Sequence, residues 1–163
     1  DDTANANSPT TNDMVLTPAV PAVNDAYYFG HNEEFPQLKV WVSTAAVNQT
    51  ITWEYWNGAW VALSGVVDGT NSFTTAGDNI VSWTAPSDWA DTTVNSQGPY
   101  RYVRARVSAI GGSPTGASGR QCQLDVTRYL PIPPSGELVR TITSAGLTAT
   151  LSQAVDTISR PFG

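Results

Sequence analysis

The residue types that most often carry catalysis or bind metal ions are few in this chain, and they are scattered. Its single histidine, His31, is followed by Glu33 and Glu34 in a polar stretch. A transition-metal site needs three or four converging ligands. A serine hydrolase would depend on this one histidine without the G-x-S-x-G turn that presents the nucleophile. We therefore interpret residues 31–36 as a solvated loop and expect no metal and no cofactor.

Oxygen-rich side chains occur in two predicted turns, where Asp68 lies near Asn71 and Asp78 precedes Asn79. Such oxygens suit Ca²⁺, but the twelve-residue EF-hand spacing is missing. Asp and Asn also fill turns because their side chains hydrogen-bond to nearby backbone. We expect these residues to stabilise turns and keep calcium binding as the alternative.

Two carboxylates that serve a glycoside hydrolase as acid and base lie about 5 to 9.5 Å apart in a cleft. Glu54, Asp88 and Asp91 are the best candidates, but nothing in their spacing brings them together. Cys122 has no neighbour that would activate a thiol, and a lone cysteine forms neither an internal disulfide framework nor a thiolate cluster. The sequence therefore predicts a protein that is not an enzyme.

The aromatic residues are stronger candidates for function. Residues 51–63 contain Trp53 and Trp56 and predict a β-hairpin, because Asn57-Gly58 suits a two-residue type I′ turn. Alternation along the first strand places Trp53 on a core face and Trp56 on the opposite face. We expect Trp53 in the core and Trp56 at a surface or an interface.

Three tryptophans, Trp41, Trp56 and Trp60, admit three interpretations. They are part of the core of their own domain, or they form a patch between subunits, where Trp is enriched at binding hot spots. Alternatively they form a flat platform on which sugar rings stack, as in carbohydrate-binding modules. The residue types leave these interpretations open, so a glycan remains the alternative partner.

The surface carries little charge. Charged residues make up 13% of the 163-residue chain, against about 25% in a typical protein. The net charge of −6 argues against nucleic acid as a partner, because neutralising phosphates requires clustered Lys and Arg. The one basic cluster, Arg101, Arg104 and Arg106, suits ion pairs on a strand face. No apolar run reaches about 18 residues, so we expect no membrane partner.

Period-two alternation and recurring turn residues predict about eight strands and almost no helix. The longest is expected over residues 100–110, where Val103, Ala105 and Val107 face the core. Ser87 is placed to cap a single helical turn. The predicted fold is all-β, an antiparallel β-sandwich with a jelly-roll-like arrangement.

Residues 1–24 and 131–163 differ from the middle of the chain and are expected to form extended arms around a sandwich domain at 25–130. Pro18 and Pro21 disfavour helix in the first arm. Its apolar residues must lie against their own domain or a neighbouring subunit. In the second arm Leu147, Ala149 and Leu151 alternate as in a strand. The predicted partner-contact residues are Val15, Leu16, Val20, Trp56, Leu138, Leu147, Leu151 and Phe162.

A pattern between residues 26 and 110 resembles a known module. It reads W-E-Y-W-N-G-x-W from Trp53, D-G-T at 68–70, F-T-x-x-G from Phe73, V-x-W-x-x-P-x-D-W from Val81 and G-x-Y-x-Y-V-R-A-R-V from Gly98. This is similar to a β-sandwich module of tailed-phage virion proteins, which include head decoration (cement) proteins and tail or baseplate components. No catalytic residue accompanies the pattern, so the resemblance implies a structural role.

From the resemblance and the two arms we expect a capsid decoration or cement protein on the virion surface. Its expected partners are the major capsid protein and other copies of itself, arranged as a trimer. Extended arms that become ordered on binding would bridge subunits. The alternatives are a carbohydrate-binding sandwich, on a tail fibre or secreted, and a tail or neck component of the same fold.

Overall fold

The computed structural model describes residues 3–125, 127–128 and 142–143. Within these residues the chain is almost entirely β-structure. It forms one short helix and twelve strands: α1 (Thr3–Ala6), β1 (Met14–Val15), β2 (Ala26–His31), β3 (Gln37–Thr44), β4 (Val47–Trp56), β5 (Trp60–Ala62), β6 (Val67–Asp68), β7 (Gly77–Ser82), β8 (Asp91–Val94), β9 (Gln97–Thr115), β10 (Ser118–Asp125), β11 (Thr127–Arg128) and β12 (Ile142–Thr143).

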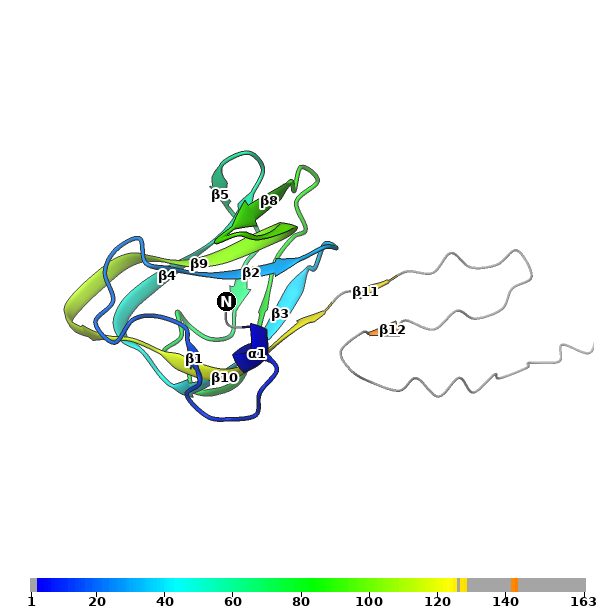
Figure 1. Ribbon diagram of the computed structural model, residues 1–163. Coiled ribbons are helices and arrows are strands. Elements are labelled where there is room, and N and C mark those ends of the chain that lie inside the picture. Colours follow the sequence, from blue (N-terminus) through cyan, green and yellow to red (C-terminus); the bar gives the residue numbers. More distant parts are fainter. Residues whose placement is uncertain (1–2, 126, 129–141, 144–163) are drawn as a thin grey trace, which may run out of the picture.

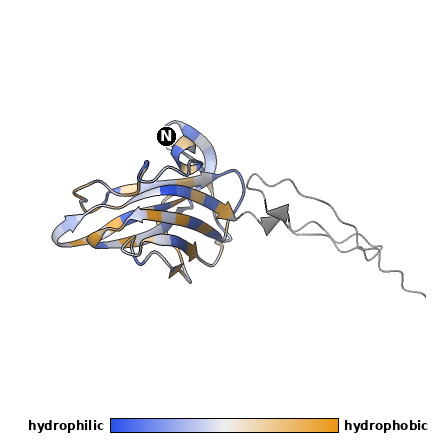
Figure 2. Cartoon of the chain, turned by 90° about the horizontal axis from the view of Figure 1, so that it is seen from below, coloured by the Kyte–Doolittle hydropathy of each residue, from blue (hydrophilic) through white to orange (hydrophobic). Residues whose placement is uncertain are grey.

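Two antiparallel sheets pack against each other, which confirms the predicted all-β sandwich (Figure 1). We call them sheet A, with strand order β1-β10-β3-β7-β6, and sheet B, with order β2-β9-β4-β5 and β8 paired to β9. Figure 2 shows hydrophilic and hydrophobic residues alternating along the strands. This is the pattern of sheets with one face in a core and one in solvent. Residues 131–141 and 144–163 of the expected second arm lie outside the described residues.

Strand β9 organises sheet B. Arg101 pairs with His31 of β2 and also with Asp91 of β8, so β2 and β8 lie on opposite sides of β9. Strand β4 pairs with β9 from Tyr55 to Val47, on the side of β8. After the end of β9, the chain turns into β10 and crosses to sheet A, at the left of Figure 1.

In the core, the small residues of β9 pack beside large aromatic ones. Val103, Ala105 and Val107 of β9 are fully buried. Ala105 lies directly opposite Trp53 of β4, and Trp53 is 4% exposed. The indole ring meets Phe73 edge-on at 5.8 Å between ring centres, a favoured geometry for aromatic pairs.

The hairpin over residues 51–63 exists, but its turn is one residue longer than predicted. Trp56 pairs with Trp60, which leaves Asn57 to Ala59 as a three-residue loop. A two-residue turn would have paired Trp56 with Ala59 and turned Trp60 to the core face. The longer loop keeps both indoles on the outer face of sheet B, where they contact each other.

The expected helical turn after Ser87 is absent. The chain from Ala85 to Ala90 forms no helix and leads into β8. Trp89 lies in this segment and is 5% exposed, and its Nε1 donates to the carbonyl of Tyr102 at 3.2 Å. Burial of one indole therefore holds the segment without a helix.

Candidate functional site

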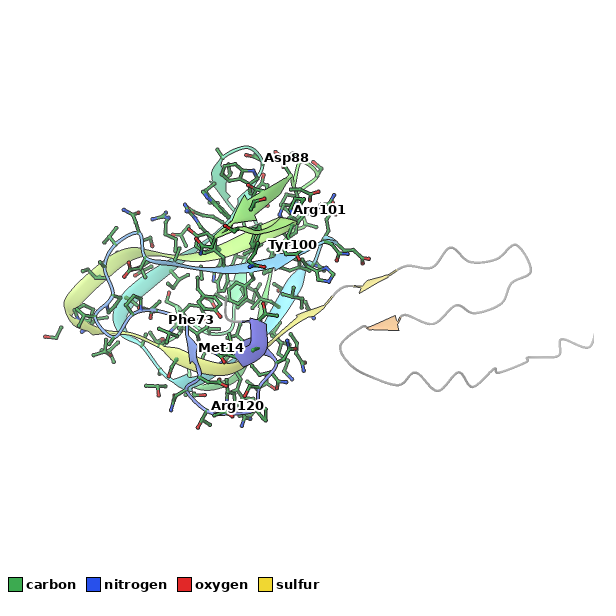
Figure 3. The ribbon with its side chains drawn as sticks, viewed as in Figure 1. Met14, Phe73, Asp88, Tyr100, Arg101 and Arg120 are labelled. Carbon is green, nitrogen blue, oxygen red and sulfur yellow. The ribbon has the colours of Figure 1, made fainter. Side chains whose placement is uncertain are left out.

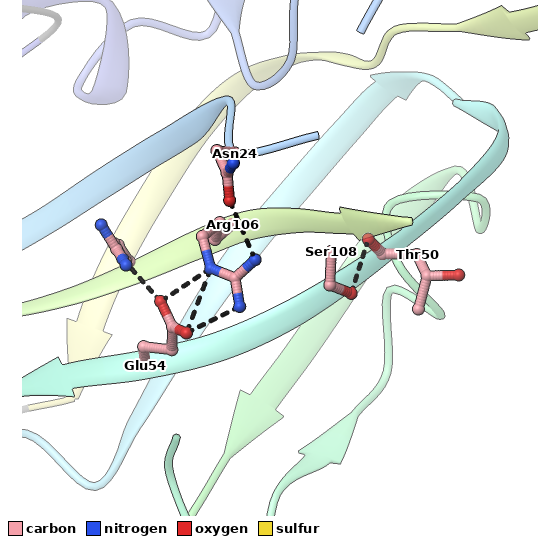
Figure 4. A network of polar contacts seen from close by, with 6 residues as sticks. Asn24, Thr50, Glu54, Arg106 and Ser108 are labelled. Atoms are coloured by element: carbon pink, nitrogen blue, oxygen red, sulfur yellow. Dashed lines mark hydrogen bonds and ion pairs between the residues drawn. The ribbon is translucent and has the colours of Figure 1, made fainter. Parts of the chain in front are cut away.

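A cluster of charged and aromatic side chains covers the outer face of sheet B, and Glu54 is at its centre. Glu54 is 6% exposed although it faces away from the core. Its carboxylate accepts hydrogen bonds from Arg104 at 2.6 Å and from Arg106 at 2.8 Å (Figure 4). Arg106 also donates to Asn24 at 3.4 Å. This confirms the expectation that the arginines of β9 form ion pairs on a strand face.

Burial would raise the pKa of Glu54, but hydrogen bonds from Arg106 and Arg104 outweigh it and hold the pKa below its ordinary value. The same bond to Glu54 raises the pKa of Arg106. One carboxylate thus serves two guanidinium groups, and the cluster carries a net positive charge on an acidic protein. Leaving either arginine without this partner would be costly, because a buried charge needs compensation.

Aromatic rings cover the cluster. Trp56 meets Trp60 at 5.4 Å and 68° between ring planes. Trp60 meets Tyr28 of β2 at 5.5 Å and 58°. The guanidinium carbon of Arg104 lies 4.4 Å from the centre of the Trp60 ring, within the range of a cation–π contact. The neighbouring rings are steeply tilted to one another and form no common plane.

The three tryptophans proposed for sugar stacking do not come together. Trp41 lies in β3 of sheet A, where the Arg120 guanidinium stacks 3.5 Å from its ring centre. Trp56 and Trp60 lie on the outer face of sheet B. All three are partly exposed rather than in the core. Of the three interpretations, a flat platform formed by Trp41, Trp56 and Trp60 together is therefore wrong.

The N-terminal segment lies on the sandwich and alternates between buried and exposed residues. Met14 and Leu16 are 0% and 1% exposed (Figure 3 labels Met14), and Pro21 is fully buried. Val15 and Val20 are 58% and 77% exposed. Leu16 is therefore a core residue and not a partner contact, because the core removes its side chain from solvent.

The same segment is held by backbone pairing. Met14 and Val15 pair with Gly119 and Ser118 of β10, and the backbone N–H of Thr17 donates to Ala117 at 3.1 Å. Residues 14–17 are thus part of sheet A rather than a free arm. Of the two alternatives left open for these apolar residues, their own domain is the one observed.

A groove of about 790 Å³ opens between the edge of sheet B at β2 and the edge of sheet A at β10. Its lining includes Tyr27 and Phe29 from β2 and Cys122 and Leu124 from β10. Helix α1 lies at one end (Figure 1). Burial raises the pKa of Cys122 to about 12, so this thiol is protonated at neutral pH and is no nucleophile.

The candidate acids lie apart, each with its own structural partner. Glu54 binds two arginines. Asp88, at the tip near β5 and β8 (Figure 3), accepts from the Tyr55 hydroxyl at 2.8 Å and from Asn57 at 2.8 Å. Asp91 lies 3.9 Å from Arg101. His31 accepts from the backbone N–H of Glu33 through Nδ1 at 3.0 Å.

The turn acids have local roles. The carboxylate of Asp68 accepts from the backbone N–H groups of Thr70 and Ser72 and from the indole of Trp53. Asp78 forms an ion pair with Lys39 at 2.6 Å. In the part of the chain that the structure describes, no three His, Cys, Asp or Glu side chains group as metal ligands. Asp68 therefore stabilises its turn as predicted, whereas Asp78 lies in β7 and pairs with Lys39 of the neighbouring strand β3.

Four predicted contact residues, Leu138, Leu147, Leu151 and Phe162, lie outside the described residues. Of the others, Trp56, Val15 and Val20 reach the surface. Sequence reasoning missed Tyr28 and the groove. Strand alternation in β2 separates Tyr28 from Phe29, but only the strand order places Tyr28 beside Trp60.

Comparisons with known proteins return no match. No family model matches the chain, and neither a curated protein nor a solved structure is significantly similar. Among the described residues no helix is long and apolar enough to cross a membrane.

Proposed function

We propose that this protein is a non-enzymatic structural component of a tailed-phage virion, in the first place a capsid decoration or cement protein. It would bind the major capsid protein and other copies of itself, as a trimer, and would strengthen the head by burying apolar surface across subunit boundaries. Specific interfaces of this kind bury about 1,600 Å². Repetition over a shell adds avidity.

The display of valines by the N-terminal segment is the observation that carries the proposal. Val15, Val20 and Val23 are exposed by 58%, 77% and 47%, while Met14 and Leu16 anchor the same segment in the core. A surface segment fixed in this way loses little conformational entropy when a partner covers it. Exposed apolar groups gathered on one segment favour a protein partner.

The sequence resemblance is consistent with a scaffold. Trp53, Phe73, Trp83 and Trp89 of the recurring pattern are all buried, and Asp68 fixes the loop between β6 and β7. These residues build the sandwich. The resemblance therefore supports a sandwich fold like that of the phage module. It does not bear on whether the protein lies at the head, tail or neck of a particle.

The proposal is tested by locating the protein. Mass spectrometry of purified particles should detect it, and electron cryomicroscopy should show trimers of the sandwich on the head lattice. Density at the tail or neck would instead favour the alternative structural role. Absence from particles would overturn the virion proposal altogether.

A variant test addresses the valine segment. Changing both Val15 and Val20 to Ser should lower the occupancy of particles at least about tenfold, because each valine buries its side chain at the interface. Val67→Ser is the matched control, since Val67 is 67% exposed on β6, at the opposite edge of sheet A. Equal occupancy for both variants would remove the segment from the interface.

A truncation tests the second arm. Removing residues 137–163 should abolish binding to particles while the sandwich stays folded, as judged by circular dichroism. Normal occupancy by the truncated protein would rule out bridging by this arm.

A glycan-binding sandwich remains the second candidate because Trp60 stacks on Arg104 and contacts both Trp56 and Tyr28 on the outer face of sheet B. Binding of a glycan there should shift or quench tryptophan fluorescence, and Trp56→Ala should abolish the shift. Silence on a glycan array, with unchanged fluorescence, would eliminate this candidate.

A further inference from the structure

The groove between β2 and β10 has the form of a site for one more strand. Strand β2 ends the order of sheet B. Strand β10 is paired by β1 only at Ser118 and Gly119. Antiparallel sheets in contact lie about 10 Å apart, so a strand added at β2 would project alternate side chains into the space between the sheets.

Both walls of the groove present apolar side chains. Phe29 of β2 is 6% exposed, and Tyr27 contacts it at 5.1 Å. Cys122 and Leu124 of β10 pair with Val40 and Leu38, and they pack on the edge of the core. Without an added strand, water would fill the groove of about 790 Å³. Contact of that water with the core edge is unfavourable.

The chain carries a segment with the matching pattern. Residues 146–151 read G-L-T-A-T-L, with Leu147, Ala149 and Leu151 on one side and Thr148 and Thr150 on the other. This alternation is typical of a strand with one buried face. Six residues also match the six residues of β2.

The pairing of β11 with β12 places Thr143, which precedes this segment, beside the residues that follow β10. Thr127 lies opposite Thr143 and Arg128 opposite Ile142, so the chain has reversed its direction and returned to the end of β10. Residues after Thr143 therefore start near the mouth of the groove of their own chain. A tethered segment competes at an effective concentration in the millimolar range, which favours it over the same segment of another copy.

We propose that residues 146–151 bind in the groove of their own chain as an added strand at the edge of β2, with Leu147, Ala149 and Leu151 directed between the sheets. Main-chain pairing supplies affinity and the alternating side chains supply register, as in other strand additions. The added strand covers an open sheet edge, which otherwise invites pairing between copies. Leu147 and Leu151 are then internal contacts, and Leu138, Phe162 and the N-terminal valines remain for partners.

Cysteine scanning of the full-length protein tests this without knowledge of the register to β2. Single variants Leu147→Cys, Leu151→Cys, Thr148→Cys and Thr150→Cys are labelled with a maleimide under native conditions. The leucine positions should react at least about tenfold more slowly than the threonine positions, because labelling requires local opening of the docked segment. The threonine variants are matched controls within one segment, and equal rates at all four positions would overturn the proposal.

Dilution distinguishes a strand supplied by the same chain from a strand supplied by another copy. Slow labelling at Leu147→Cys that is unchanged over a hundredfold range of protein concentration supports docking within one chain. Protection that disappears on dilution, together with a dimer in sedimentation, would overturn it in favour of exchange between copies.

A change in the groove provides an independent measurement. Leu124→Arg places a charge on the groove wall and should raise labelling at Leu147→Cys toward the rate of the threonine variants. Val67→Arg is the control, because Val67 is 67% exposed on β6 at the opposite edge of sheet A and should leave the rate unchanged. A Leu124→Arg variant that labels as slowly as its control would place the segment elsewhere. None of these outcomes depends on membership of a virion.

Discussion

The two long sides of the sandwich are completed differently. On one side, the loop between β6 and β7 covers the edge of β4. There the Ser72 hydroxyl accepts from the backbone N–H of Ile51 at 3.0 Å, and Gln49 donates to the Ser72 carbonyl at 3.1 Å. Phe73 fills the space between the sheets and is 0% exposed. On the other side, between β2 and β10, the described chain leaves a groove of about 790 Å³.

Closing a side with a loop has a conformational cost. Asn71, Ser72 and Phe73 have φ angles of 48°, 63° and 62°, in the left-handed region that is unfavourable for residues other than glycine. The hydrogen bonds to Asp68 and the burial of Phe73 offset that cost. A sheet edge is thus closed by whichever segment can supply an apolar side chain and bonds for its own backbone. The groove lacks such a segment among the described residues.

The largest predicted effect is the loss of unfolding free energy when an apolar residue is removed from each side. Phe73→Ala should lower the free energy of unfolding by about 4 kcal/mol, because it empties a fully buried site. Leu124→Ala should cost only about 1–2 kcal/mol in a protein that ends at residue 136, since Leu124 is half-buried at a groove that the proposed strand then leaves open. Urea denaturation measures both. A cost for Leu124→Ala close to that of Phe73→Ala would mean that the groove is tightly filled.

Asp68 provides the next contrast. Asp68→Ala should cost about 3 kcal/mol, because two backbone N–H groups and the Trp53 indole lose their charged acceptor. Asp78→Ala is the control, since its ion pair with Lys39 is exposed and such pairs contribute about 0–1 kcal/mol. Similar costs for the two variants would show that Asp68 is not what holds the strained loop.

The core could be predicted from the sequence because a core face depends on local alternation. Trp53 and Val103 follow from the side on which each residue of a strand must point. The predicted turn after Trp56 is one residue too short. A loop of two or three residues fits the same Asn-Gly pair, and only packing of Trp60 against Arg104 favours the longer loop.

The surfaces could not be predicted in the same way, because they depend on the order of strands in each sheet. Tyr28 and Trp60 come together across β9 and β4, and no local pattern encodes that order. The prediction of Leu16 as a partner contact is wrong for a related reason: the apolar residues of the segment show that it must lie against something, but not whether its own domain or a neighbour buries it. The resemblance covered residues that build the core, so it indicated a fold more directly than a function.

Glu54 lies on the outer face of sheet B, away from both sides of the sandwich, and provides a reference for the two. Glu54→Gln should cost about 2 kcal/mol at pH 7, because Arg104 and Arg106 lose their shared charge. The pKa of Glu54 is lowered in the folded protein, so its carboxylate stabilises the fold above about pH 4.5, the unfolded value. That stabilisation disappears as the pH falls through the lower folded pKa. Denaturation curves of wild type and variant should therefore converge in acid. A constant difference down to about pH 2 would mean that shape rather than charge matters.

The smallest predicted effect concerns one hydrogen bond on the closed side. Ser72→Ala removes the acceptor for the backbone N–H of Ile51 and should cost about 1 kcal/mol. Because about 1.4 kcal/mol corresponds to a factor of ten in local opening, the Ile51 amide should exchange its hydrogen roughly fivefold faster. The amide of Val103, which lies in a central strand away from either side, should exchange at its wild-type rate. Unchanged exchange at Ile51 would show that water replaces Ser72 without loss, so that the closed side is held by Phe73 and Asp68 alone.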